Sequence, residues 1–157
     1  MVDAGRRGFL GGRLRKEAPL RPPWALPEAI FSDRCSRCGD CTGTCPQGIL
    51  KLDEGGYPIV DFSRGECTFC TACLGACRTG ALVRGEMPWR LTPAVSQACL
   101  PRSGIECRSC EDACPASAIR FVPRLGGPAL PAVDGERCTG CGACVAPCPA
   151  AAIALRA

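Results

Sequence analysis

The 157-residue sequence contains no histidine. This absence excludes His-ligated haem, Rieske-type clusters and imidazole acid–base catalysis. Aromatic residues make up only 5% of the chain, and no apolar stretch is long enough to cross a membrane. With so few large apolar side chains, the chain cannot build an ordinary hydrophobic core for its length. We therefore expect cofactors or cross-links to supply part of its cohesion.

Sequence motifs for organic catalysis are also missing. The chain has no G-x-G-x-x-G fingerprint, no P-loop and no flavin fingerprint. Acidic residues do occur in or beside the cysteine runs, where a surface or turn position is their ordinary explanation: Asp40, Glu66, Glu111 and Asp112. We predict no catalytic residues and no enzymatic activity.

Sixteen cysteines are the dominant chemical feature of the chain. The clearest run, Cys138 to Pro149, has the spacing C-x2-C-x2-C-x3-C-P, in which thiolates hold iron–sulfur clusters and the fourth Cys binds the neighbouring cluster. Disulfides would need an oxidising compartment and an export signal, and zinc sites use paired C-x2-C motifs, often with His. Neither explains this spacing. We therefore predict [4Fe–4S] clusters, four in number.

The formal net charge of +4 changes sign once clusters are included. A [4Fe–4S] core with four thiolates carries a net charge of about −2, so four clusters would bring the protein to about −4. This balance argues against a nucleic-acid partner. The basic residues are nevertheless concentrated near the N-terminus: Arg6, Arg7, Arg13, Arg15, Lys16 and Arg21.

The first two cysteine runs form an internal duplication, since they begin at Cys35 and Cys67. Between them, residues 47–52 and 57–62 are predicted strands joined by a turn. Residues 33–86 resemble a bacterial two-cluster ferredoxin, a pair of pseudo-symmetric units of loop, short helix and strand. The predicted fold class is therefore α+β, with tandem ferredoxin-like domains over 31–86 and 87–157.

The second half repeats this pattern after a joint over residues 87–98, where we expect Trp89 to pack. Thr92 is a candidate N-cap for a short helix from Pro93 to Cys99. Residues 116–122 and 129–133 are predicted strands, with a turn at 126–128.

The third cysteine run is irregular, because seven residues instead of two separate Cys99 from Cys107. One interpretation makes Cys99 a cluster ligand that reaches the site from a longer loop. The other makes it a buried structural thiol beside a cluster with only three cysteines. We favour ligation, because this cluster otherwise lacks a fourth thiolate.

The ferredoxin resemblance implies that the fourth cysteine of each run crosses to the partner cluster. The expected ligands of the four clusters are Cys35, Cys38, Cys41 and Cys77 for cluster 1; Cys67, Cys70, Cys73 and Cys45 for cluster 2; Cys99, Cys107, Cys110 and Cys148 for cluster 3; and Cys138, Cys141, Cys144 and Cys114 for cluster 4.

One residue departs from the repeat: Arg78 follows Cys77, whereas Pro follows the fourth cysteine of the other three runs. A cation and an extra backbone N–H beside a cluster favour its reduced state. We therefore expect the cluster bound by Cys77 to have a raised potential. The alternative is a solvated surface arginine.

The N-terminal arm and linker, residues 1–30, include Arg6-Arg7, which resembles a twin-arginine export signal. No uninterrupted apolar segment follows it, so export is the least favoured interpretation. The alternatives are a disordered basic tail, or an amphipathic arm over 9–15 that docks on a partner. The segment 21–27 is predicted to be an extended linker. Trp24 and Phe31 are expected to cover clusters.

The whole chain resembles the NapF family, ferredoxin-type accessory proteins of periplasmic nitrate reductase systems. The resemblance rests on residues 3–10, on Pro22-Pro23-Trp24, and on three regular cysteine runs with one irregular run flanked by Ala98 and Leu100. It implies a cytoplasmic protein that binds the catalytic molybdenum subunit before export and helps it to mature, with the Arg6-Arg7 arm as a candidate contact. The alternatives are a general electron carrier, an electron-input subunit of a larger oxidoreductase and a cluster-donating scaffold.

Overall fold

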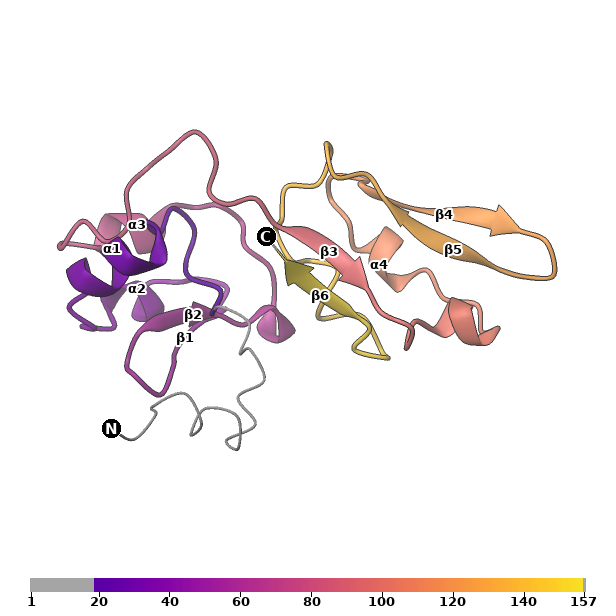
Figure 1. Ribbon diagram of the computed structural model, residues 1–157, viewed down its shortest axis with the longest axis horizontal. Helices are drawn as coiled ribbons and strands as arrows, with labels where there is room; N and C mark the ends of the chain where they lie inside the picture. The colour runs from indigo at the N-terminus through magenta and orange to yellow at the C-terminus, as the bar shows by residue number, and fades with distance from the viewer. Residues whose placement is uncertain (1–18, 157) are drawn as a thin grey trace, which may run out of the picture.

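The computed structural model describes residues 19–156, which form two lobes side by side (Figure 1). The first lobe contains three short α-helices, a 3-10 helix and a hairpin: α1 (Glu28–Arg34), α2 (Asp40–Gly43), β1 (Leu50–Leu52), β2 (Pro58–Val60), η1 (Phe62–Arg64) and α3 (Ala72–Ala76). The second contains β3 (Thr92–Val95), η2 (Leu100–Ser103), α4 (Ser109–Asp112), β4 (Ile119–Arg124), β5 (Gly127–Val133) and β6 (Ile153–Arg156).

Each lobe has an antiparallel hairpin between its two cysteine runs, as the sequence predicts. In the first lobe, β1 pairs with β2, and the Asp53 carboxylate accepts N–H bonds from Gly55 and Tyr57 in the turn. Strand β2 is shorter than expected, because the chain turns into η1 at Phe62. The Asp61 side chain caps η1 by accepting the N–H of Ser63.

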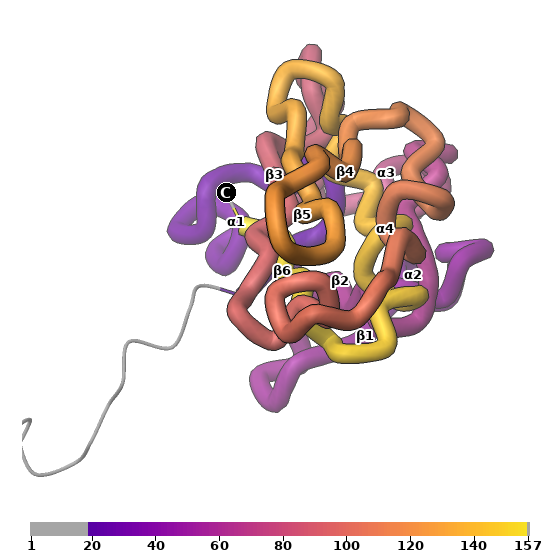
Figure 2. Tube along the Cα trace, turned by 90° about the vertical axis from the view of Figure 1, so that its right-hand side faces the viewer, coloured from indigo at the N-terminus to yellow at the C-terminus, as the bar shows by residue number. Residues whose placement is uncertain are grey.

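The hairpin of the second lobe, β4–β5, is longer and points away from the first lobe (Figures 1 and 2). Its turn consists of Leu125 and Gly126, one residue earlier than the predicted turn begins, and Gly126 takes the positive φ of 74° that the tight turn requires.

The predicted helix from Pro93 to Cys99 is wrong: residues 92–95 form strand β3, which pairs antiparallel with the C-terminal strand β6. This pairing satisfies the backbone of both segments and buries Pro93. The local capping signal at Thr92 could not reveal a partner strand that lies 58 to 64 residues later in the chain. Tertiary pairing therefore overrides the local helix signal.

The proline-rich segment before α1 pairs with the end of the first lobe, as β3 pairs with β6 in the second, so it is more than a linker. Its backbone is hydrogen-bonded to the end of the lobe. The C=O of Trp24 accepts the N–H of Val83, the N–H of Leu26 donates to the C=O of Ala81, and Ala25 forms a β-bridge with Leu82. Each lobe therefore opens with an extended, proline-containing segment that pairs with the last segment of the same lobe.

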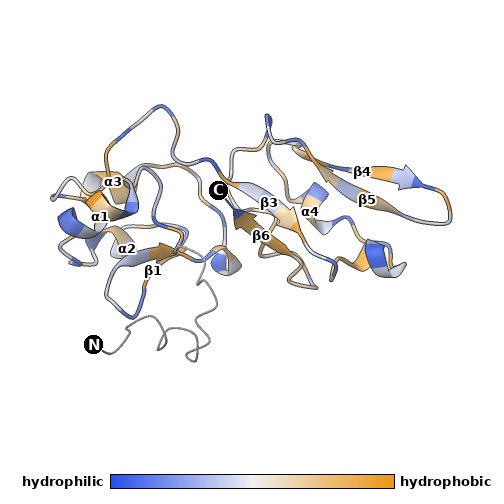
Figure 3. Cartoon of the chain, in the orientation of Figure 1, coloured by the Kyte–Doolittle hydropathy of each residue, from blue (hydrophilic) through white to orange (hydrophobic). Residues whose placement is uncertain are grey.

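Two small apolar clusters form the core, and cysteines belong to both. The first is built around Phe31, Ile49 and Phe62, and the second around Ile119 and Ile153. Figure 3 shows hydrophobic colour on short pieces such as β6 rather than along any extended element. None of the helices within residues 19–156 is long and apolar enough to cross a membrane.

The two lobes are in contact, and Trp89 lies at their joint as expected. Its ring meets those of Phe62 and Phe69 edge-on, with centroids 5.8 and 6.1 Å away. From the second lobe, the buried glycines Gly140 and Gly142 lie against Trp89 and Phe62. The arm with Arg6 and Arg7 lies outside the described residues.

Candidate iron–sulfur centres

Four cavities are each lined by four cysteines, and the groups are those that the crossing of fourth cysteines predicts. We name the cavities sites 1 to 4: site 1 has Cys35, Cys38, Cys41 and Cys77; site 2 has Cys45, Cys67, Cys70 and Cys73; site 3 has Cys99, Cys107, Cys110 and Cys148; site 4 has Cys114, Cys138, Cys141 and Cys144. The structure thus brings three cysteines of one run together with one cysteine of its partner run in every case.

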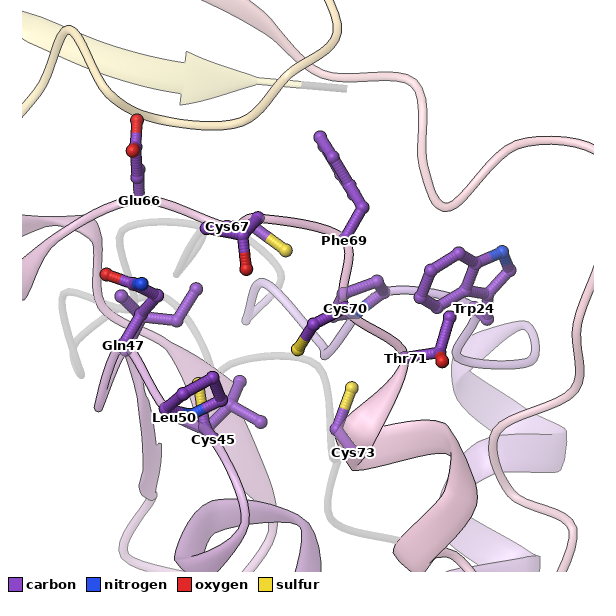
Figure 4. Close-up of a pocket in the computed structure, with 14 residues that line it drawn as sticks. Trp24, Cys45, Gln47, Leu50, Glu66, Cys67, Phe69, Cys70, Thr71 and Cys73 are labelled. Carbon is purple, nitrogen blue, oxygen red and sulfur yellow. The ribbon is translucent and has the colours of Figure 1, made fainter.

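Site 2 shows the arrangement most clearly (Figure 4). Cys67 and Cys70 come from the loop that enters α3, Cys73 lies in the first turn of α3, and Cys45 comes from the first run; their sulfur atoms point into a shared space. Trp24 and Phe69 form part of the apolar wall. The expectation that Trp24 covers a cluster therefore agrees with its position.

Left-handed backbone positions aim the first three thiols of a regular run. In the second run, Phe69 and Thr71 flank Cys70 with φ values of 54° and 64°. In the fourth run, Gly140 and Gly142 flank Cys141 in the same way. Because L-residues other than glycine rarely adopt this conformation, Phe69 and Thr71 hold local strain at the site. Sequence reasoning missed this feature, which the sequence shows as glycine at both positions of the fourth run and at Gly39 in the first.

The fourth cysteine of each run is followed, three residues later, by another left-handed residue. In the second lobe these are Ser117 (φ 47°) and Ala151 (φ 45°), and in the first lobe glycines occupy the same position. The turn directs the next backbone N–H at the thiol: the N–H of Ala152 lies 3.3 Å from Cys148 Sγ, and Ala118 makes the same contact with Cys114 at 3.2 Å. Such N–H···S bonds favour the thiolate.

Site 3 accommodates the irregular run because the inserted loop closes on itself. Residues 100–103 form η2, Gly104 takes a φ of 85°, and the N–H of Ile105 returns to the C=O of Leu100 at 3.1 Å. The two ends of the loop therefore meet, and Cys99 lines the same cavity as Cys107. The Cys99 side chain is buried, with 9% of the residue exposed.

Site 1 is the largest of the four cavities, with about 760 Å³ of space, part of it open solvent, against about 320 to 350 Å³ for the others. Cys38 is exposed at its mouth, and the exposed Arg37 and Arg78 stand on its rim. Phe31 forms part of the inner wall, as expected for a residue that covers a cluster.

Burial makes most of the central thiols weak acids. It raises the pKa of Cys41, Cys73 and Cys110 to about 11 and that of Cys144 to about 12, with neighbouring cysteines adding to the shift. These groups are protonated at neutral pH unless a metal stabilises the thiolate, so metal binding must release protons.

Cys77 differs from these four thiols, because its pKa is lowered. Burial raises its pKa, but backbone N–H donors from Leu82, Ala81 and Thr79 and the Thr79 hydroxyl together lower it below the usual value. The donors do not include Arg78, so a contribution from that residue has to come from its charge.

The donor chemistry fits a cluster. Within residues 19–156, no group of three or more His, Cys, Asp or Glu side chains is arranged to hold a single metal ion. Each site instead places four soft sulfur donors around a cavity, which suits an iron–sulfur cluster whose irons each take one thiolate.

Comparison with known proteins gives the same chemistry. Residues 34–82 and 105–152 each match the 4Fe-4S dicluster domain. The chain is 44% identical over 154 residues to ferredoxin-type protein NapF of Escherichia coli, which covers 97% of this chain and 94% of that protein. Its identity to NapF of Haemophilus influenzae is 47% over 137 residues, or 87% of this chain and 78% of that protein. The chain belongs to the NapF family.

The NapF family is thus the family that the sequence resemblance names. A further relative, the methylamine utilization ferredoxin-type protein MauM of Methylorubrum extorquens, is 37% identical over 156 residues, covering 87% of this chain and 71% of that protein. The chain is therefore an iron–sulfur protein of the ferredoxin type with two tandem dicluster domains, as members of the NapF family are expected to be.

Proposed function

We propose that the chain binds four [4Fe–4S] clusters, one at each of sites 1 to 4, and serves in the cytoplasm as an electron-transfer accessory protein that helps the catalytic molybdenum subunit of periplasmic nitrate reductase to mature. The observation that carries the proposal is the closed grouping of all sixteen cysteines into four sets of four, in a chain 44% identical to a NapF protein.

The grouping supports electron transfer rather than substrate chemistry. Four thiolates saturate the four irons of a cubane, so none remains open to bind a substrate. Such clusters, when bound, accept and release single electrons. The protein residues would hold each cluster, limit its contact with water through walls such as Trp24 and Phe31, and donate N–H bonds to its sulfur ligands.

The cysteine frame alone does not identify the partner. A protein named for methylamine utilization shares 37% identity with this chain, so related chains serve more than one system. Partner choice therefore has to depend on residues outside the cluster sites. The basic N-terminal arm is the proposed contact, because Arg6 and Arg7 are among six basic residues within positions 6–21 of the sequence.

A binding experiment with the purified holoprotein tests this assignment. Immobilised chain is mixed anaerobically with the catalytic-subunit precursor of nitrate reductase, and with its mature form. We expect retention of the precursor, and loss of retention when Arg6 and Arg7 are both changed to Gln. Replacing the exposed Arg64 and Arg84 by Gln removes the same charge outside the arm, serves as the matched control and should leave retention unchanged. Equal retention of unrelated proteins, or no retention of the precursor, would refute the assignment.

A general electron carrier is the second candidate, and the exposed thiol at site 1 favours it. Cys38 is exposed at the mouth of this site, so a partner could approach its cluster closely without a specific interface. A carrier should reduce several unrelated acceptors rapidly and bind none of them tightly. A maturation factor should bind one precursor tightly and lose its effect once that protein is assembled.

A further inference from the structure

A direct hydrogen bond joins the two lobes at their candidate ligand residues. The backbone N–H of Cys67 donates to the C=O of Cys141 at 2.8 Å. Cys67 lines site 2 in the first lobe, and Cys141 lines site 4 in the second. One path between these two sites therefore runs through the atoms of two cysteines and one hydrogen bond, with no other residue between them.

The packing around this bond is closely fitted. A Cβ atom at Gly142 would overlap the Phe62 ring, and one at Gly140 would lie 2.9 Å from Trp89 Nε1 and 3.0 Å from the Leu91 C=O. The fourth cysteine run can therefore approach the first lobe this closely only because it has glycine at both positions.

Trp89 lies at the centre of this contact. Its ring packs between Phe62 and Phe69, and Phe69 stands between Cys67 and Cys70 in the ligand loop. Its indole N–H is buried without a hydrogen-bond partner in the described part of the chain, which is unfavourable for the folded state. The indole therefore contributes to the joint through its ring contacts with Phe62 and Phe69 and not through a hydrogen bond.

Inside each lobe, the two sites also face each other through their central cysteines. Helices α2 and α3, which carry Cys41 of site 1 and Cys73 of site 2, pack together. In the second lobe, Cys110 of site 3 and Cys144 of site 4 belong to the same buried cluster. Sites 1 and 2, sites 2 and 4, and sites 4 and 3 are thus successive neighbours.

We propose that the joint around Cys67 and Cys141 couples the lobes electronically, so that the four sites form a single chain in the order 1, 2, 4, 3. The inference rests on the proposed binding of clusters at these sites. A one-electron donor of the dithionite class reduces one lobe by one electron. When that electron crosses the joint, the first lobe returns to its oxidised state and the second is reduced by one, with no proton or bond rearrangement.

Electron paramagnetic resonance of the fully reduced holoprotein tests the coupling, with iron and acid-labile sulfide measured on every sample. Phe62→Ala and Trp89→Ala loosen the joint without changing a cysteine. Two controls match them: Trp89→Phe keeps a ring at the joint, and Tyr57→Ala removes a ring that contacts Phe31 in the first lobe, away from the joint. We expect the wild type to show spin–spin broadening, both loosening variants to lose part of it, and both controls to retain it.

The outcomes separate this inference from the proposed function. Full cluster content with identical spectra in all five proteins would overturn the coupling while leaving cluster binding intact. A wild type that holds too little iron for four clusters would instead refute the proposed function. If the loosening variants lose iron, the redistribution of electrons after pulse reduction of the wild type decides. A rate independent of protein concentration supports one chain of sites. A phase with a rate proportional to concentration shows that the lobes exchange electrons only by collision, and it overturns the inference.

Discussion

Cys99 and Cys107 line one cavity although seven residues separate them, because the inserted loop turns back through η2 and Gly104. The same cavity contains Cys110 and Cys148. If Cys99 completes this set, its sulfur takes the place that the first cysteine has in a regular run. If Cys99 is only a buried thiol, it lines the cavity without binding iron.

Replacing Cys99 decides between these roles. We expect Cys99→Ser and Cys99→Ala to lose iron equivalent to about one cluster of the four, since a cubane with three thiolates is labile. Iron and acid-labile sulfide analysis of anaerobically purified protein measures this loss. Cys138→Ser, in a regular run, should lose a similar amount, and Ser103→Ala, on the same loop as Cys99, should lose none. Full iron content in both Cys99 variants would show that this residue is not a ligand.

Arg78 stands exposed on the rim of site 1, and its charge is its means of acting on a cluster there. A unit charge near the surface contributes on the order of 0.5–1 kcal/mol, which corresponds to about 20–40 mV for one electron. We expect Arg78→Gln and Arg78→Pro to lower the potential of one cluster by about this amount, because a positive charge favours the reduced state.

A redox titration followed by paramagnetic resonance measures the potential. Arg78→Lys keeps the charge and should keep the wild-type value. The difference between Arg78→Gln and the wild type should also shrink at high salt, since an exposed charge is screened. An unchanged potential in both Arg78→Gln and Arg78→Pro would identify Arg78 as an ordinary surface residue.

At the scale of elements, Asp61 links the first hairpin to the joint. Its carboxylate forms an ion pair with Lys51 on β1 at 2.8 Å and accepts the N–H of Ser63. This second bond caps η1, whose first residue, Phe62, lies against the second lobe. The hydrogen bond from Lys51, followed by that from the Ser63 hydroxyl, lowers the pKa of Asp61 to about 2.

The pH dependence of stability follows from this lowered pKa. An unfolded Asp has a pKa of about 3.9, so the stabilisation is fully present above pH 4 and is lost as the pH falls towards 2. We expect Asp61→Ala to lower the free energy of unfolding by about 1 kcal/mol, equally at every pH between 5 and 8. Anaerobic chemical unfolding at pH 3.5 to 8 measures the difference. Asp61→Asn keeps the cap and loses only the ion pair, so it should cost less. A difference that varies between pH 5 and 8 would contradict the assignment.

The sequence predicts local elements well where the signal is local. Both hairpins lie between cysteine runs, as alternation and turn residues indicate. The pairing of β3 with β6 and of Ala25 with Leu82 could not be predicted, because each joins segments about 60 residues apart. For the same reason, the repeat predicts which cysteines group together, whereas the contact between Cys67 and Cys141 depends on how two complete lobes fit.

At the scale of the whole molecule, the four sites take the place of a large core. The apolar clusters are small, cysteines belong to both of them, and no charged or polar residue is buried among residues 19–156. Binding of metal to such sites is coupled to folding, because the thiols converge only in the folded chain. We therefore expect removal of the clusters to affect both lobes, which share their contacts at the joint.

Cluster removal should also reverse the sign of the net charge. The apoprotein has a formal charge of +4 with its thiols protonated, and each bound [4Fe–4S] cluster with four thiolates adds about −2. Four clusters give about −4, whereas two give about zero. At pH 7 we therefore expect the holoprotein to bind an anion exchanger. The chelator-treated apoprotein, with its thiols blocked by a neutral alkylating agent, should bind a cation exchanger instead. Reconstitution with iron and sulfide should restore binding to the anion exchanger.

A holoprotein with iron for four clusters that still binds the cation exchanger would contradict this charge balance. Because the charge depends on the number of clusters and not on which cysteines hold them, the measurement counts clusters independently of every ligand assignment.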